Sequence, residues 1–196
     1  MLKGFKKYKS LGPDGCSVEF FLHLFDLVGR DILRVVDQSR DEGRVTGALN
    51  ATFITLIPKC DKPTSFSNFR PIYLCNLVYK VISKLVAIRL KVVLEKTISR
   101  YQFGFLHDRQ IIEPVDIVQE ALHSIKTENQ QVLVLKLDLV KAFDRVNWSF
   151  LRLVLLQIGI PGNFVSWIMG CVESTNFDVL INGTPSFFFP VSRGIR

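Results

Sequence analysis

The sequence lacks the patterns of several common classes of site. It has no pair of cysteines in a C-x-x-C arrangement, and its three histidines lie far apart, so it offers neither a zinc-ligand spacing nor a disulfide framework. It also has no Walker A or G-x-G-x-x-G pattern, which gives no support to nucleotide binding through a glycine-rich loop. Scattered cysteines indicate a reducing, intracellular compartment. They are Cys16, Cys60, Cys75 and Cys171.

Long hydrophobic runs are missing as well. The runs FFLHLF and VLVLKLDLV are interrupted by polar residues well before the ~20 residues that a membrane-spanning helix needs. The opening MLKGFKKYKS is basic, but it leads into the turn LGPDG and not into the apolar stretch of a signal peptide. We therefore expect a soluble protein with no membrane partner.

The composition provides enough apolar side chain for an ordered core. Hydrophobic residues make up 48% of the chain and charged residues 22%, which excludes a disordered protein. Lys and Arg outnumber Asp and Glu by 25 to 18, giving a net charge of +7. A surplus of this size fits a polyanionic partner but also arises by chance, so charge alone leaves nucleic-acid binding open.

Hydrophobic periodicity and turn signals predict an α+β fold with an antiparallel component. Strands are expected over residues 52–57 and 131–138, the latter buried, and the chain should be extended at 69–72, before and after Pro71. Asn182-Gly183 predicts a β-hairpin near the end. Helices are expected over residues 18–37, 76–97, 117–126, 147–158 (followed by Gly159) and 162–173.

An aspartate follows the second predicted strand. In the run KLDLVKAFD, Asp138 stands where the apolar residues end and a turn into a helix begins. A carboxylate in that position can hold a divalent cation beside backbone groups. It can also simply cap the next element, which is the commoner role of such an aspartate. Asp144, six residues later, is expected to cap or pair locally.

A basic stripe runs along the predicted helix 76–97. At 100° per residue, Lys80, Lys84 and Lys91 fall within roughly 40° of one another. The stripe fits a surface that faces phosphates, and it equally fits an ordinary solvated helix face. Apolar residues lie on the other side, toward a core: Val78, Ile82, Leu85 and Val93.

Two further features have ordinary explanations beside functional ones. His107-Asp108-Arg109 suggests catalysis, but no nucleophile motif accompanies it, which favours a surface histidine. The run Phe187–Phe189 could stack on bases, although a run that covers both faces of a hairpin strand is more often half core.

Six runs of the sequence occur together, in this order, in one family. The chain closely resembles the reverse transcriptase domain of non-LTR (LINE-type) retrotransposons, particularly the plant kind, over nearly its whole length. The runs are KSLGPDG (9–15), ALNATFITLIPK (48–59), NFRPIYLCNLVYKVISKLVAIRLK (68–91), YQFGFLHDRQII (101–112), VLKLDLVKAFDRVNW (134–148) and VLINGTPSFFFPVSRGIR (179–196).

The resemblance implies a right-hand polymerase fold and RNA-directed DNA polymerase activity. Residues 1–125 would form the fingers and the fingers–palm region, and residues 126–196 the first part of the palm. The implied partners are an RNA template, a DNA primer and dNTPs, in a nuclear or cytoplasmic location. Two Mg²⁺ ions would assist the in-line transfer of the nucleotidyl group.

The resemblance also implies roles for individual residues. Asp138 would be one of three metal-binding carboxylates, and the Leu139 carbonyl would complete the coordination. Phe143 matches the ring that excludes a 2′-hydroxyl. The remaining roles are triphosphate binding by Arg70, Lys80 and the Ala142 N–H, and nucleic-acid binding by Lys84, Lys91 and Arg109.

The sequence departs from the family pattern at identifiable positions. Tyr73 replaces the usual serine of FRPISL, and His107-Asp108 replaces the Pro-Gly before Arg109. The Q-G-D-P-L-S-P run and the Y-A-D-D hairpin, which would supply the other two carboxylates, are not in the sequence. We therefore expect a fragment that is inactive alone. The alternatives are a non-catalytic nucleic-acid-binding remnant and a degenerate gene model that is never made as protein.

Overall fold

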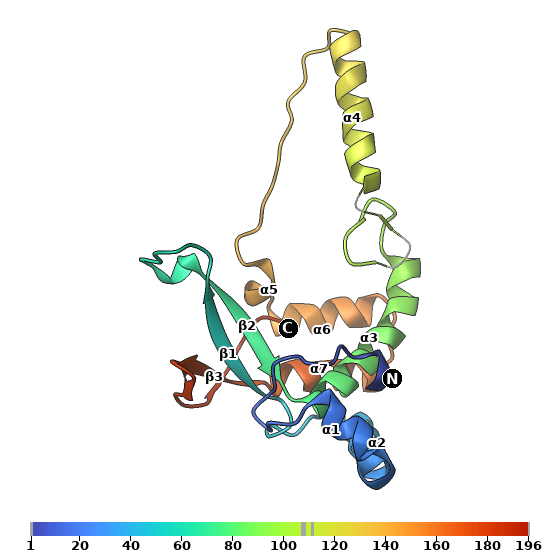
Figure 1. Cartoon of the computed structure of the whole chain (residues 1–196). Coiled ribbons are helices and arrows are strands. Elements are labelled where there is room, and N and C mark those ends of the chain that lie inside the picture. The colour runs from blue at the N-terminus through green and yellow to red at the C-terminus, as the bar shows by residue number, and fades with distance from the viewer. Residues whose placement is uncertain (1, 107–108, 111, 196) are drawn as a thin grey trace. The chain divides into compact units, whose positions relative to one another are not determined.

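The structure, a computed structural model, describes residues 2–106, 109–110 and 112–195 of the chain. The chain forms two compact units (Figure 1). The first consists of Met1–Val86 and Phe143–Arg196, and the second of Ala87–Ala142. The first unit joins segments from both ends of the sequence.

The first unit is built on a mixed β-sheet with the strand order β2-β1-β3-β4, in which β5 also pairs with β3. The central strand β1 pairs antiparallel with β2 and parallel with β3. The expected hairpin around Asn182-Gly183 is confirmed as β3–β4, with φ values of 51° and 82° at its two turn residues. The strands are β1 (Ala51–Pro58), β2 (Phe69–Cys75), β3 (Asn176–Ile181), β4 (Thr184–Pro185) and β5 (Phe189–Pro190).

The helices largely follow the predicted pattern. The expected helix over 18–37 is two helices, α1 (Val18–His23) and α2 (Phe25–Glu42), which meet at Leu24. The short 3₁₀ helices η1 and η2 lie at Leu2–Gly4 and Phe66–Asn68. The others are α3 (Leu77–Thr97), α4 (Ile112–Thr127), α5 (Ala142–Arg145), α6 (Trp148–Gln157) and α7 (Gly162–Glu173).

The core of the first unit lies where α2, α7 and the start of α3 meet. Trp167 of α7 is 1% exposed, and its indole N–H donates a hydrogen bond to the Ser39 hydroxyl of α2 over 3.1 Å. The two helices approach so closely that a Cβ atom on Gly170 would overlap the Gly43 carbonyl oxygen. On α3, Ile82 is fully buried, as the sequence predicts.

A buried asparagine ties the sheet to the helices. The Asn50 side chain is 0% exposed, and its Nδ2 lies 2.8 Å from the Cys171 carbonyl oxygen and 2.8 Å from the Ser174 hydroxyl. The Tyr79 hydroxyl donates to the same Cys171 carbonyl over 3.1 Å. Burial raises the pKa of the Tyr79 phenol, and it raises the pKa of the Cys171 thiol to about 12. These contacts fix the start of β1 against the end of α7.

The predicted buried strand 131–138 is wrong. The stretch from Gln130 to Val140 forms neither helix nor strand, and it is exposed throughout, with Leu133 at 92%. Figure 1 shows it as a plain tube, with neither a coiled ribbon nor an arrow, between α4 and α5. Its composition favours a strand, but a strand needs a hydrogen-bonding neighbour, and none of the described strands pairs with it.

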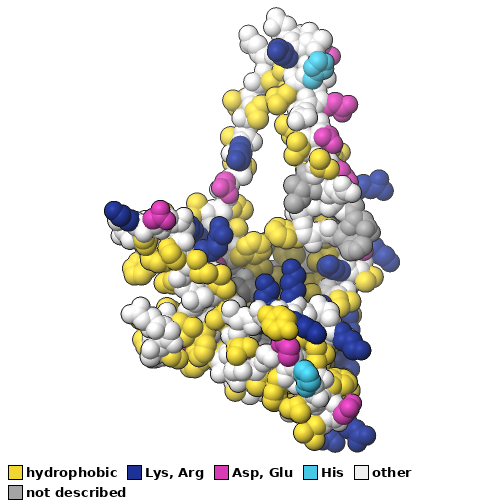
Figure 2. All heavy atoms as spheres, in the orientation of Figure 1, with side chains coloured by type: hydrophobic (Ala, Val, Ile, Leu, Met, Phe, Trp, Pro, Cys, Tyr) yellow, Lys and Arg dark blue, Asp and Glu magenta, His cyan; other side chains and the backbone are white. Residues whose placement is uncertain are grey.

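The second unit contains the end of α3, the loop after it, α4 and the exposed stretch. The helix expected over 117–126 is longer than predicted, since α4 begins at Ile112. In Figure 2 yellow hydrophobic side chains follow the stretch between α4 and α5. In the part of the chain that the structure describes, no helix combines the length and apolar character needed to cross a membrane.

Candidate active site

Asp138 and Leu139 lie in the exposed stretch of the second unit. A divalent cation takes about six oxygen ligands, so a carboxylate needs others beside it to hold one. Within residues 2–106, 109–110 and 112–195, no three His, Cys, Asp or Glu side chains form a group that could hold a metal. The described residues therefore do not by themselves fit a two-ion site.

Phe143 lies at the second position of α5, in the first unit. The preceding Lys141 has a φ of 50°, so the chain turns sharply from the exposed stretch into this short helix. The Phe143 residue is 58% exposed, and its carbonyl oxygen accepts a hydrogen bond from the Ile195 N–H over 2.9 Å. The backbone is thus held in place while most of the side chain stays accessible.

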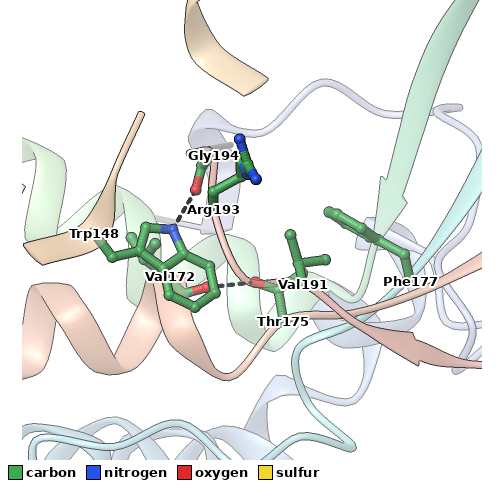
Figure 3. Close-up of a pocket in the computed structure, with 7 residues that line it drawn as sticks. All are labelled: Trp148, Val172, Thr175, Phe177, Val191, Arg193 and Gly194. Atoms are coloured by element: carbon green, nitrogen blue, oxygen red, sulfur yellow. Dashed lines mark hydrogen bonds between the residues drawn. The ribbon is translucent and has the colours of Figure 1, made fainter. Parts of the chain in front are cut away.

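Two motifs that are far apart in the sequence lie side by side here. The Gly194 N–H donates to the Val146 carbonyl over 2.8 Å, and the Trp148 indole N–H donates to the Gly194 carbonyl over 2.6 Å (Figure 3). Gly194 has a φ of +90°, and a Cβ there would lie 3.1 Å from the Asp144 carbonyl oxygen. Only glycine suits both this positive φ and this close approach of the backbone, so the VSRGI run docks on AFDRVNW through its glycine.

An open pocket of about 360 Å³ lies beside this junction, and we call it the aromatic pocket. The Tyr73 and Phe177 rings are 5.3 Å apart between centroids, and Phe177 lies 6.4 Å from Phe189. The Asp144 and Arg193 residues add charge of both signs. Its lining consists of Ile54, Tyr73, Asp144, Phe177, Phe189, Pro190, Val191, Ser192, Arg193 and Gly194.

Strand register brings the aromatic side chains together. Ile54 and Tyr73 are opposite one another on β1 and β2, and Phe177 and Phe189 are opposite one another on β3 and β5. Opposite residues point to the same side of a sheet, so the four line one face. From the sequence, Tyr73 stands out only as a departure from serine, and no pattern points to Arg193. The one sequence feature that could have indicated this shared face is the alternation of apolar residues along the strands.

The predicted triphosphate-binding cations lie on different elements. Arg70 is exposed at the second position of β2, and Lys80 is in the first turn of α3. The last five residues of β2 lie between them and, at about 3.3 Å per residue, cover roughly 16 Å along the strand.

The basic stripe on α3 is not a uniform solvated face. Lys84 is half-buried, its Nζ lies 4.4 Å from the centroid of the Phe5 ring, and it donates to the Gly4 carbonyl over 3.4 Å. Lys80 is half-buried as well, whereas Lys91 is exposed in the part of α3 that belongs to the second unit. Lys84 therefore holds the N-terminal segment against the helix.

The Arg109 guanidinium is engaged with backbone at the end of α3. It donates to the carbonyl oxygens of Ile98, Ser99 and Gln102, of which the Ile98 contact measures 3.1 Å. These bonds close the loop that follows the helix and occupy donors that a phosphate would otherwise use. His107 and Asp108 lie outside the described residues.

Comparisons with known proteins agree with the motifs. The family model "Reverse transcriptase (RNA-dependent DNA polymerase)" matches residues 57–196. The chain belongs to the reverse transcriptase family. Its relatives place this reverse transcriptase domain among those of non-LTR, LINE-like retrotransposons.

The similarity to these relatives covers most of the chain but a small part of each relative. The uncharacterized 149 kDa protein of transposon TX1 from Xenopus laevis is 30% identical over 188 residues, which is 96% of this chain and 14% of that protein. The RNA-directed DNA polymerase from the mobile element jockey of Drosophila melanogaster is 28% identical over 159 residues, 79% of this chain and 17% of that protein. The probable RNA-directed DNA polymerase from transposon X-element of the same organism is 28% identical over 145 residues, which is 72% of this chain and 16% of that protein.

Membership of the family carries general consequences. Reverse transcriptase domains act on a nucleic-acid template and primer with nucleotide substrates, and they generally use divalent metal ions.

Proposed function

We propose that this domain serves RNA-directed DNA synthesis, the template-directed addition of dNTPs to a primer 3′ end. The observation that carries the proposal is the junction of AFDRVNW with VSRGI beside the aromatic pocket, inside the matched residues 57–196. The junction fixes the backbone around Phe143 and leaves the ring accessible. RNA as template, DNA as primer, Mg²⁺ as the metal and an element of the plant kind are parts of this proposal.

Within the proposal, Phe143 excludes a 2′-hydroxyl by its bulk, and the Ala142 N–H lies near the triphosphate. The aromatic pocket takes a base, because the half-buried rings of Tyr73 and Phe189 offer flat apolar surface. Arg70 and Lys80 supply positive charge for phosphates from two different elements. Lys84, Lys91 and Arg109 bind the nucleic-acid backbone, with Arg109 retaining only the donors that its backbone contacts leave.

Metal binding is proposed for Asp138 and the Leu139 carbonyl. When bound, divalent ions stabilise negative charge on the transferred phosphate and on the attacking and leaving oxygen atoms. Among the described residues, Asp138 belongs to no group of three or more side chains that could hold a metal. We propose that residues 1–125 act as fingers and fingers–palm region and residues 126–196 as the first part of the palm.

A second candidate function is nucleic-acid binding without synthesis by these residues alone. The observation in its favour is that Asp138 is exposed and, among the described residues, belongs to no group of three or more side chains that could hold a metal. One carboxylate offers too few hard oxygen ligands for a pair of divalent cations.

Primer extension on poly(rA) with an oligo(dT) primer, dTTP and Mg²⁺ tests both candidates. We expect residues 1–196 alone to give no product, whether or not Asp138→Asn is present. In a fusion that adds the remaining palm of a LINE-type relative, we expect extension that Asp138→Asn abolishes. Asp116→Asn, an exposed aspartate on α4, is the matched control and should leave extension unchanged.

The outcomes separate the two functions. Extension by the fusion that depends on Asp138 supports synthesis. A fusion that binds the primer–template but never extends it favours binding without synthesis. Extension by residues 1–196 alone that is sensitive to Asp138→Asn would contradict the argument from the single carboxylate.

A further inference from the structure

A second pocket in the first unit is lined by lysines. It has a volume of about 240 Å³ and lies between residues 5–18 and the start of α3. Lys6, Lys9 and Lys80 line it together with apolar residues such as Leu11 and Leu77, and no acidic residue is among those that line it. It shares no lining residue with the aromatic pocket. We call it the lysine pocket.

The segment that carries Lys9 is fixed by a buried asparagine. Asn76 is 4% exposed, its Oδ1 accepts a hydrogen bond from the Asp14 N–H over 3.0 Å, and its Nδ2 donates to the Ala48 carbonyl over 3.1 Å. Gly12 lies against the same residue, since a Cβ on Gly12 would be 2.6 Å from the Asn76 backbone nitrogen. A chain packed this closely cannot shift without losing the buried hydrogen bonds.

The segment that carries Lys6 is fixed at its other end. The Lys84 ammonium lies over the Phe5 ring and donates to the Gly4 carbonyl. The Leu2 side chain is buried, so the first turn of the chain is anchored as well. Lys6 and Lys9 therefore project from a held backbone, which lowers the conformational entropy that a ligand would have to overcome.

The carboxylates closest in sequence are engaged elsewhere. A Glu19 oxygen accepts a hydrogen bond from the Tyr8 N–H over 3.0 Å, and backbone hydrogen bonds lower the pKa of this carboxyl group. An Asp14 oxygen accepts from the Cys16 N–H over 3.0 Å. Across the described residues, none of the three pocket lysines forms an ion pair with a carboxylate. Three like charges that share one pocket repel one another unless an anion joins them.

We propose that Lys6, Lys9 and Lys80 form a binding site for phosphate groups. The pocket is large enough for more than one phosphate, and lysines bind phosphate as point charges without demanding one geometry. Figure 2 shows dark blue side chains gathered over the stretch of chain that follows the N-terminus. Lys6 and Lys9 lie outside residues 57–196, which the family model matches. The phosphate can belong to a free polyphosphate chain or to a nucleic-acid strand. This choice of source and the part that Lys80 plays rest on the proposed function, whereas the parts of Lys6 and Lys9 do not.

Isothermal titration of the full chain with sodium tripolyphosphate at low salt tests the site. We expect Lys6→Gln/Lys9→Gln to weaken binding about tenfold or more, because two charge-assisted hydrogen bonds are lost. Lys3→Gln/Lys7→Gln removes the same charge from the same segment outside the lysine pocket and should change affinity about twofold or less. Lys6→Arg/Lys9→Arg should retain binding, and thermal unfolding of each variant checks that it folds.

Competition distinguishes the two sources of phosphate. If a single-stranded 12-nucleotide RNA displaces tripolyphosphate, and Lys6→Gln/Lys9→Gln weakens the RNA as well, the site takes a strand. If RNA does not compete, the site takes a free polyphosphate. Equal weakening by both Gln pairs, or no heat of binding with millimolar tripolyphosphate, would overturn the proposal. The measurement needs no DNA synthesis, so an inactive fusion in primer extension leaves it intact.

Discussion

At the scale of single residues, Phe143 combines a fixed backbone with an accessible ring. Its carbonyl accepts from the Ile195 N–H, and the neighbouring residues Asp144 and Val146 contact Gly194. The Phe143 residue is 58% exposed on the first unit. A ring held in this way can act by steric exclusion, because exclusion requires that the backbone does not yield.

We expect Phe143→Val to admit ribonucleotides in the fusion that restores the palm. Removing the ring opens space for a 2′-oxygen, so the preference for dNTP over rNTP should fall by about 10- to 100-fold while dNTP use changes little. Single-nucleotide extension with dTTP and UTP measures the ratio. Phe150→Val, on an α6 residue that is 64% exposed, is the matched control and should not change it. An unchanged ratio for Phe143→Val would show that the ring is ordinary packing.

At the scale of secondary-structure elements, the contact between α2 and α7 depends on two glycines. Gly43 ends α2 with a φ of +59°, and Gly170 of α7 lies directly against it. The helices can approach this closely because neither position carries a Cβ.

Gly170→Ala should therefore destabilise the protein. The added methyl group would overlap backbone, which cannot move aside, so the cost should reach the upper end of the ~1–3 kcal/mol typical of overpacking. Gly162→Ala is the control in the same helix, because its Cβ would meet nothing within 4 Å, and it should be neutral or stabilise by about 0.5–1 kcal/mol. Urea unfolding followed by circular dichroism measures both. Equal midpoints for the two variants would exclude a tight α2–α7 contact.

Helix α3 carries the basic stripe of Lys80 and Lys84 in the first unit and Lys91 in the second. If Lys80, Lys84 and Lys91 face phosphates, their replacement by alanine should weaken RNA binding and make its salt dependence shallower, by about 0.7 in slope for each lost contact. Fluorescence anisotropy across a salt titration measures this slope. The matched control is a variant in which three exposed lysines outside the stripe are replaced by alanine, so that the same charge is removed. They are Lys59, Lys62 and Lys126. If both triples change the slope equally, the stripe is a general positive surface and not a binding face.

At the scale of the whole molecule, the exposed stretch between α4 and α5 differs from the rest of the chain. Its residues from Gln130 to Val140 form no helix or strand and remain open to solvent. In the first unit, by contrast, the parallel pairing of β1 with β3 joins the N-terminal segment of the chain to the C-terminal one. Segments without protecting hydrogen bonds are the first to be cleaved by proteases.

Brief trypsin treatment should therefore cut first after Lys136 or Lys141. Lys80, half-buried within α3, offers a comparable site that should survive longer because the helix must open before cleavage. Mass spectrometry identifies the first cut, and gel filtration should show that the two fragments still elute together, since β1 and β3 lie on different fragments. Early cleavage after Lys80, with Lys136 and Lys141 intact, would mean that the exposed stretch is protected.

Much of this protein follows from local sequence. The turn at Asn182-Gly183, the helix expected over 147–158 and the long helix α3 were predictable because each depends on residues a few positions apart. The six motif runs likewise identified the family before any geometry was known.

Tertiary structure decided the rest, because its determinants are contacts between distant residues. No local pattern places Tyr73 against Phe177 or Trp148 on Gly194, and none assigns Arg109 to the end of α3. The stretch around Asp138 also shows that local sequence alone does not determine the structure. Its apolar residues have strand composition, but a strand forms only where a second strand satisfies its backbone hydrogen bonds, and the sequence of one segment does not say whether that neighbour is there.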